Sequence, residues 1–218
     1  MPGLSLPSPV SSASLLDLAP VVPVVVLHDL ADAVPLATAL VAGGLPVIEI
    51  TLRTPVALAA IERIAAEVPG AVVGAGTVVT PVDVTASVAA GARFLVSPGS
   101  PPRLVDALVE SGVAFLPGVA TATEVLSLLE RGLTEMKFFP AADAGGPSYL
   151  RSLGGPLPSV RFCPTGGIDR QSAPSYLALP NVACVGGSWI TPRDAVGAGD
   201  WARVEQLARD AASLRTPA

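Results

Sequence analysis

The stretch "LTEMKFFPA", residues 133–141, combines a pattern that recurs along this chain with the chain's most unusual residue. Residues 135–141 form a short apolar run with two phenylalanines, the kind of run that predicts a buried strand. Lys137 stands inside this run and is the only lysine of the chain, since the other twelve of the thirteen positively charged residues are arginines. The stretch therefore raises two questions: what sheet the strand belongs to, and why a lysine is placed there.

Seven further apolar runs resemble this one, and each begins about 20 to 25 residues after the run before it. They are residues 21–27, 46–52, 71–77, 93–99, 114–119, 161–167 and 182–189. Ala- and Leu-rich segments lie between the runs, often with a proline near the start and a glycine at the end, which is typical of helices. Eight strand–helix alternations predict an α/β protein with a (β/α)8 TIM barrel as a single domain over residues 1–218. A short extra N-terminal helix is expected around Ser11–Leu18, after a disordered tail at residues 1–10.

Local signals refine the expected helices. Pro55 is predicted at the first position of a helix that follows Thr54. Thr121 and Glu124 have the spacing of a capping box. A doubly wound open sheet is the alternative fold, but its glycine-rich fingerprint is missing, because Val79 stands where the stretch "GAGTVV" (74–79) would need its third glycine.

Composition excludes several classes of protein. The net charge of −5 without a basic cluster argues against nucleic-acid binding, and no apolar run approaches the roughly 18 residues of a membrane span. The N-terminus lacks the positive residues of a secretory signal. Cys163 and Cys184 are too few for a disulfide scaffold and are expected to be buried thiols in a reducing cytoplasm. No metal site is indicated.

Polar residues gather at the expected carboxyl ends of the strands, where barrels carry their reactive groups. Glu49 and Thr51 share one strand face because side chains alternate along a strand. If that face points into the barrel, Glu49 is a carboxylate in a confined apolar place. The alternative is a structural carboxylate paired with Arg53.

Lys137 also has two interpretations. It can be a lysine that reaches solvent while its stem packs on phenylalanine rings. It can instead be a Schiff-base nucleophile, because burial disfavours the charged ammonium form of a lysine and makes its amine available. The absence of any other lysine favours the nucleophile.

Two glycine pairs follow the seventh and eighth runs, in "PTGGI" (164–168) and "VGGSW" (185–189). Backbone amides beside such glycines can approach an anion, and barrels commonly bind phosphate after these two strands. Turn glycines without a ligand are the alternative. His28, the sole histidine, is expected to be a solvated loop residue.

Six motifs together resemble the bacterial 2-keto-3-deoxy-6-phosphogluconate (KDPG) and 4-hydroxy-2-oxoglutarate (KHG) aldolases. They are "VAGGLPVIEITLRTP" (41–55), "VGAGTV" (73–78), "SPG" (97–99), "EMKFFPA" (135–141), "RFCPTGGI" (161–168) and "VGGSW" (185–189). The resemblance covers roughly residues 16–212. It implies a class I aldolase of the Entner–Doudoroff pathway: a cytoplasmic homotrimeric barrel that uses no metal or cofactor.

The resemblance also implies roles for single residues. It assigns the Schiff base to Lys137, acid–base catalysis to Glu49, the substrate carboxylate to Arg53, and the carboxyl and keto region to Thr77. It implies that Pro98 and Phe139 form walls of the pocket. It implies that the substrate's hydroxyls and phosphate are held by Thr165, Gly166, Gly167, Gly187 and Ser188. Some relatives carry an arginine about where this chain has Val26, so one charged phosphate contact is expected to be missing.

Two other functions remain open at this level. One is the sister aldolase for the phosphogalactonate epimer, which differs in how the C4 hydroxyl is held near Thr165. The other is a non-catalytic trimeric scaffold, against which the intact set of Lys137, Glu49 and Arg53 argues. No arginine could replace Lys137 in forming an iminium, since arginine stays protonated at any working pH.

Overall fold

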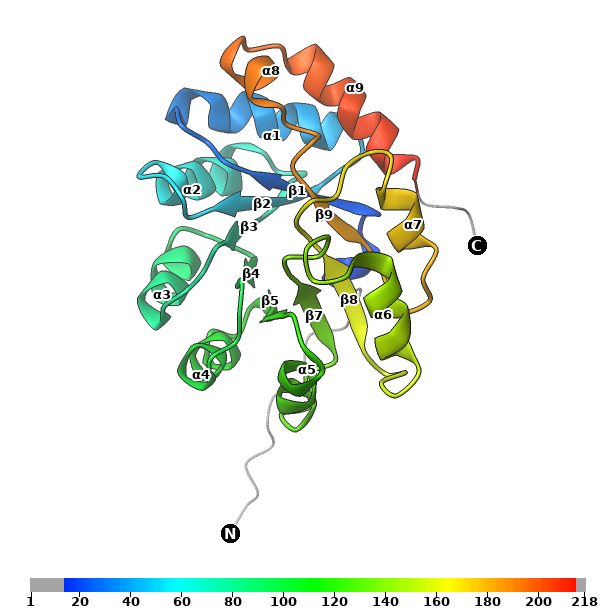
Figure 1. Cartoon of the computed structure of the whole chain (residues 1–218). Coiled ribbons are helices and arrows are strands. Elements are labelled where there is room, and N and C mark those ends of the chain that lie inside the picture. The colour runs from blue at the N-terminus through cyan, green and yellow to red at the C-terminus, as the bar shows by residue number, and fades with distance from the viewer. Residues whose placement is uncertain (1–13, 215–218) are drawn as a thin grey trace.

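The computed structural model describes residues 14–214, and its strands lie at the centre of a ring of helices (Figure 1). All strands fall within the predicted runs. They are β1 (Val21–Val25), β2 (Val47–Thr51), β3 (Val72–Gly76), β4 (Phe94–Val96), β5 (Ala114–Leu116), β6 (Gly118–Val119), β7 (Glu135–Phe138), β8 (Arg161–Pro164) and β9 (Val185–Gly187). The fifth run forms two strands rather than one, because Pro117 between them has no N–H to donate to a ladder.

The strands form two curled parallel sheets. One has the order β5-β4-β3-β2-β1-β9 and the other the order β6-β7-β8. The sheets meet at two places. An isolated parallel bridge joins Thr165, just after β8, to Gly186 of β9, and the Lys137 N–H of β7 donates to the Pro117 carbonyl between β5 and β6 at 3.0 Å. The carboxyl ends of all strands therefore lie on one side of the molecule.

Helices follow most strands and cover the outside of the sheets. They are α1 (Ala33–Ala42), α2 (Ala57–Glu67), α3 (Pro81–Ala89), α4 (Pro102–Glu110), α5 (Ala122–Leu129), α6 (Gly146–Gly154), α7 (Ala173–Leu177), α8 (Arg193–Gly197) and α9 (Trp201–Ala212). Thr121 and Glu124 form the predicted capping box at α5. The prediction for Pro55 is wrong, because α2 begins two residues later at Ala57, after a turn.

The expected N-terminal helix is not a full helix in the described residues. Only one 3-10 turn is present there, η1 (Leu15–Asp17), capped by the Ser14 hydroxyl, which accepts from the Leu16 N–H. The predicted tail at residues 1–10 and the start of the expected helix lie outside the described residues. A second 3-10 turn, η2 (Leu30–Asp32), leads into α1.

Side-chain alternation divides the interior into two apolar clusters. On β7, Met136 and Phe138 point outward into the large cluster between strands and helices, and both are fully buried. The smaller cluster occupies the other strand face, the one that carries Glu49 and Lys137. Its buried members are Leu16, Val22, Val47, Phe94, Val96, Leu116, Cys163 and Cys184. Leu16 brings η1 into this inner cluster, so the N-terminal turn packs against the amino ends of the strands.

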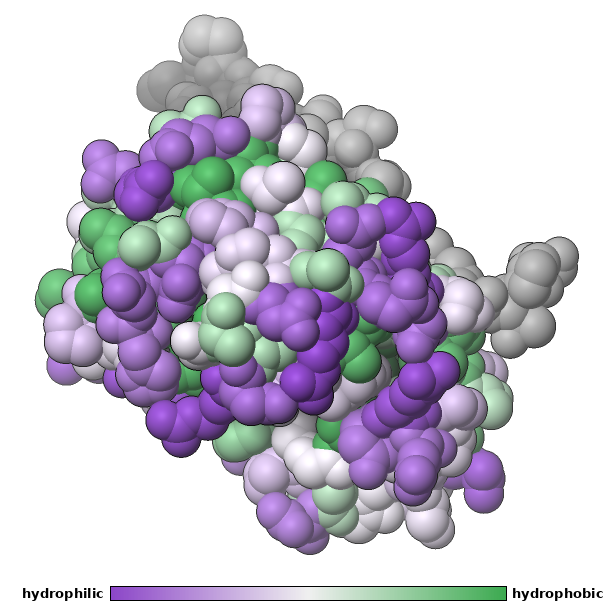
Figure 2. Space-filling model, turned by 90° about the horizontal axis from the view of Figure 1, so that it is seen from above, coloured by the Kyte–Doolittle hydropathy of each residue, from purple (hydrophilic) through white to green (hydrophobic). Residues whose placement is uncertain are grey.

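The outer surface over α8, α9 and α1 carries bands of hydrophilic residues with smaller apolar patches between them (Figure 2). Within residues 14–214, no helix combines the length and the hydropathy needed to cross a membrane.

Candidate active site

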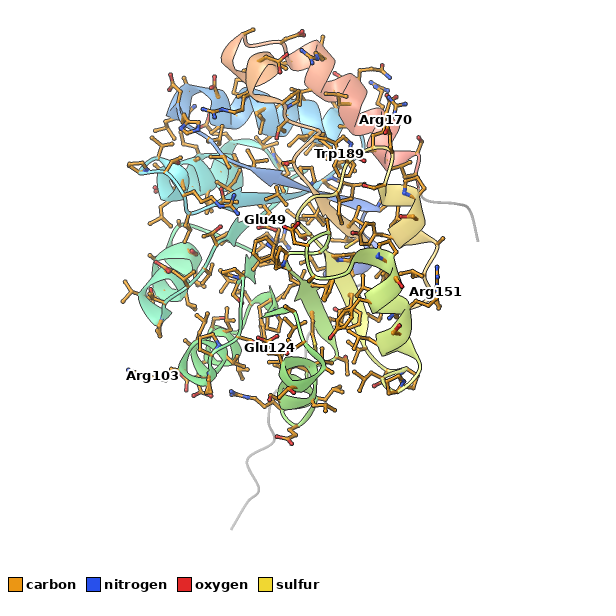
Figure 3. All side chains as sticks on the ribbon, in the orientation of Figure 1. Glu49, Arg103, Glu124, Arg151, Arg170 and Trp189 are labelled. Carbon is orange, nitrogen blue, oxygen red and sulfur yellow. The ribbon has the colours of Figure 1, made fainter. Side chains whose placement is uncertain are left out.

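Lys137 and Glu49 meet inside the ring of strands. Lys137 comes from β7 and Glu49 from β2, and their relative exposures are only 4% and 3%. The Lys137 Nζ lies 3.3 Å from Glu49 Oε1 and 5.4 Å from the centre of the Phe139 ring. Figure 3 shows Glu49 at the centre of the strands. The interpretation of Lys137 as a lysine that reaches solvent is therefore wrong: its amine ends at a buried carboxylate.

The carboxylate of Glu49 is also not paired with Arg53, so that structural interpretation is wrong as well. Its partner is Lys137, and the fit around it depends on Gly76 of β3. A Cβ atom at position 76 would lie 2.0 Å from Glu49 Oε1 and 2.5 Å from its Cγ. Glycine at this position leaves the space in which the Glu49 side chain turns toward Lys137.

Arg53 is held at the rim by Thr77 instead. Its Nε donates to Thr77 Oγ1 at 3.1 Å. Thr77 has φ +59°, the one positive φ of a non-glycine residue within the described chain. Such a conformation costs on the order of 1–3 kcal/mol and persists only where the surroundings fix it. The end of β3 is therefore strained where it orients the guanidinium of Arg53.

A cavity of about 460 Å³ opens beside this pair at the carboxyl ends of the strands. It brings together six predicted site residues: Arg53, Phe139, Thr165, Gly166, Gly167 and Ser188. Lys137 and Glu49 do not line it but lie deeper. Phe139 links the two, since it lines the cavity and its ring lies near the Lys137 amine. Thr77 and Pro98 are not among the lining residues.

The two glycine pairs differ in how they meet the cavity. Gly166 and Gly167 both line it and have φ +102° and +70°, values that favour glycine. In the second pair it is Gly186, not the predicted Gly187, that lines the cavity. A Cβ at Gly187 would lie 1.8 Å from the Trp189 ring, so this glycine makes room for the tryptophan.

Sequence reasoning missed part of the lining. The residues that were not predicted as part of the site are Val24, His28, Ile168, Thr191, Pro192 and Arg193. Val26 and Gly186 also line the cavity, at positions where the sequence places the expected phosphate site. His28 is exposed, as expected for a loop residue, but it faces the cavity. Thr191, Pro192 and Arg193 follow the last recognisable motif, and no spacing in the sequence distinguishes them.

The cysteines behave as predicted. Cys163 and Cys184 are free and buried. A hydrogen bond with Cys163, together with burial, raises the pKa of the Cys184 thiol well above its ordinary value, which makes this thiol unreactive. Within residues 14–214, no group of three His, Cys, Asp or Glu side chains is arranged to hold a metal ion.

A buried lysine amine beside a buried carboxylate, below a cavity at the carboxyl ends of parallel strands, is the arrangement expected of enzymes that use a lysine for covalent catalysis. The comparisons with known proteins specify which enzymes. The family model for KDPG and KHG aldolase matches residues 13–207. The chain belongs to this family.

Among the similar proteins is the KHG/KDPG aldolase of Escherichia coli K12, which is 49% identical over 201 residues, covering 92% of this chain and 94% of that protein. A solved KDPG aldolase from Legionella pneumophila, with pyruvate captured as a covalent carbinolamine intermediate, has a TM-score of 0.89 and 47% identity, covering 90% of this chain and 96% of that one. The Zymomonas mobilis ZM4 enzyme with 3-phosphoglycerate has a TM-score of 0.88 and 50% identity, covering 92% and 94%.

Proposed function

We propose that this protein is a class I aldolase that cleaves 2-keto-3-deoxy-6-phosphogluconate to pyruvate and glyceraldehyde 3-phosphate. The same chemistry would cleave 4-hydroxy-2-oxoglutarate to pyruvate and glyoxylate. The observation that carries the proposal is the buried contact of 3.3 Å between the only lysine of the chain and Glu49. The names of the curated relatives favour the phosphogluconate substrate over the phosphogalactonate epimer.

In the cleavage direction, the Lys137 amine attacks C2 of the keto acid, and the carbinolamine loses water to give an iminium. Glu49 is close enough to exchange protons with Lys137 directly, and it takes the proton of the C4 hydroxyl. The C3–C4 bond then breaks, and its electrons move into the iminium to form an enamine. The aldehyde leaves, C3 is protonated, and water releases pyruvate and restores the amine. The iminium is the electron sink, so we expect no metal or cofactor to take part.

The remaining site residues bind and orient the substrate. Arg53, held by Thr77, is placed to bind the carboxylate at C1. Phe139 and Pro98 are proposed as walls on either side of the reacting carbons. Thr165, Gly166, Gly167 and Ser188, with Gly187 behind them, are proposed to hold the hydroxyls and the phosphate, because all but Gly187 line the cavity.

We also propose that the two sheets form one closed (β/α)8 barrel in a single domain over residues 1–218, with β5 and β6 as one interrupted strand. The contacts at Thr165–Gly186 and Lys137–Pro117 support closure.

A cytoplasmic homotrimer is the assembly we propose. Val79, Val82 and Val109, on and near α3 and α4, are 52%, 75% and 50% exposed. This apolar surface is what a second copy of the chain could cover. Sedimentation of the wild-type protein and of Val82→Arg would test the assembly, since a charge inside the interface should favour monomers.

Covalent trapping tests the function directly. Borohydride added with pyruvate should attach one pyruvate-derived mass to the Lys137 peptide and inactivate the protein. Because the chain has no other lysine, only the α-amino group could compete. Activity should also survive exhaustive chelation. An unlabelled Lys137 peptide, or activity that zinc restores after chelation, would contradict the Schiff-base mechanism.

A further inference from the structure

We infer that Arg193 binds the phosphate group of the substrate, at the opposite end of the cavity from the carboxylate site of Arg53. This inference rests on the proposed function, because it requires a substrate with two anionic ends. Arg193 is the first residue of α8 and lines the cavity together with Thr191 and Pro192. Ser188, a few residues earlier in the same connection, lines it too.

The strand order separates the two arginines. Arg53 follows β2, Arg193 lies beyond β9, and β1 is between these strands in the sheet. Arg53 is tied by Thr77, which follows β3, to the side of the cavity next to β2 and β3. Arg193 follows β9, the strand that Thr165 joins through its bridge to Gly186, so it lies on the same side of the cavity as Gly166 and Gly167. One arginine is thus available for each end of an extended substrate.

The guanidinium of Arg193 has no acidic partner within 4 Å among residues 14–214. Its neighbour Asp194 is occupied elsewhere: Arg203 Nη1 lies 2.7 Å from the Asp194 carboxylate and lowers its pKa. None of the described residues that line the cavity is Asp or Glu. A cation at the cavity without a competing carboxylate is a site for an anion from solution.

Charge is what the glycine amides cannot supply. Backbone N–H groups near Gly166, Gly167 and Ser188 can donate hydrogen bonds, but a phosphate ester carries nearly two negative charges. A guanidinium adds both charge and a planar pair of donors that match two phosphate oxygens. Arg193 is exposed, so its attraction should weaken as salt increases.

The test compares Arg193→Ala with Arg103→Ala on two substrates, the phosphorylated keto acid and the same keto acid without its phosphate. Arg103 is the matched control: it is also an exposed arginine in the first turn of a helix, but it lies at the outer edge of α4, away from the strands (Figure 3). Arg193→Ala should lower kcat/KM about 10-fold or more for the phosphorylated substrate, mainly through KM. It should change kcat/KM less than about two-fold for the other substrate, and Arg103→Ala should spare both.

Two further measurements make the outcome decisive. Inorganic phosphate should inhibit the wild-type enzyme competitively, and about 10-fold more weakly after Arg193→Ala, while Arg193→Lys should recover part of the loss. Equal losses on both substrates, or an unchanged phosphate inhibition constant in a folded Arg193→Ala protein, would overturn the inference. If the wild-type protein cleaves neither substrate, the proposed function fails instead, independently of Arg193.

Discussion

Strand β7 carries two charged side chains on its inner face, two residues apart, and their surroundings are opposites. The side chain of Glu135 is 30% exposed and that of Lys137 is 5% exposed. Glu135, at the amino end, accepts from the Ser14 hydroxyl at 2.7 and 2.8 Å and from Arg161 Nη1 at 2.9 Å. Lys137, near the carboxyl end, has a single polar side-chain contact among residues 14–214, with Glu49 at 3.3 Å.

The difference separates a structural cluster from the pair that we propose to be catalytic. Arg161 also pairs with Asp17, and the hydrogen bond to Asp17 raises the pKa of Arg161 above its ordinary value. Its charge therefore never changes at working pH. Ser14 and Arg161 both donate to Glu135, and two N–H groups of Arg161 donate to Asp17. Within the described chain, Lys137 and Glu49 have only each other as side-chain hydrogen-bond partners, and they lie beside a cavity that a substrate could enter. A bound substrate could provide further contacts to Lys137 and Glu49, whereas the charged groups at the amino end of β7 already pair with one another.

Lys137→Arg should produce the largest effect of any substitution on β7. Arginine keeps the positive charge near Glu49 but cannot form an iminium, so aldol turnover and borohydride labelling should both fall below detection. The measurement is steady-state cleavage of the keto acid together with mass spectrometry of the trapped peptide. Glu135→Gln, on the same face of the same strand, is the control and should retain both activities; comparable loss in that variant would remove the proposed distinction between the two ends.

Glu49→Gln should have the next largest effect. An amide cannot accept the C4 hydroxyl proton, and loss of a general acid–base group typically lowers kcat by about 10²–10⁴-fold. Pyruvate should still be trapped on Lys137, but more slowly, because the nucleophile remains. Rapid-quench trapping and steady-state rates measured on the same preparation would separate the two steps. A kcat within about three-fold of wild type would assign the proton transfers to another group.

Gly76→Ala should reduce activity without removing a proposed catalytic group. Its Cβ would lie 2.0 Å from Glu49 Oε1, so the carboxylate must move away from Lys137. A displacement of about 1 Å in such a site can cost about 10²-fold in rate, and overpacking a core costs about 1–3 kcal/mol of stability. Gly197→Ala is the matched control, since no heavy atom lies within 4 Å of a Cβ there. Urea unfolding and kcat, measured on both variants, check the prediction; wild-type kcat in Gly76→Ala would show that the position of Glu49 is not critical.

The fold was largely predictable because its signals are local. Apolar runs such as 46–52 and 135–141 become β2 and β7, and the Thr121–Glu124 spacing becomes a cap, since each depends on neighbours within a few residues. Pairing in space was less predictable. The sequence suggests Arg53, four residues away, as an ionic partner of Glu49. The actual partner, Lys137, is 88 residues away in the chain. The cavity residues that belong to motifs were predicted. Arg193 follows the last motif, and no local pattern shows that its side chain reaches the cavity.

Arg161→Ala should have the smallest effect, on stability alone. The Arg161 side chain is 38% exposed, so water screens its pairs with Glu135 and Asp17, and such pairs contribute about 0.2–1 kcal/mol. For a protein of this size that corresponds to a decrease in Tm of at most about 2–4 °C. The loss should shrink in high salt, where the wild-type pairs are already weakened. Thermal unfolding at low and high salt measures this loss of stability. Arg161→Lys should retain part of the stability, and both variants should have the kcat of the wild-type protein. A substantial fall in kcat with an unchanged Tm would show that the amino end of β7 is coupled to Lys137, and the two ends could no longer be described as independent.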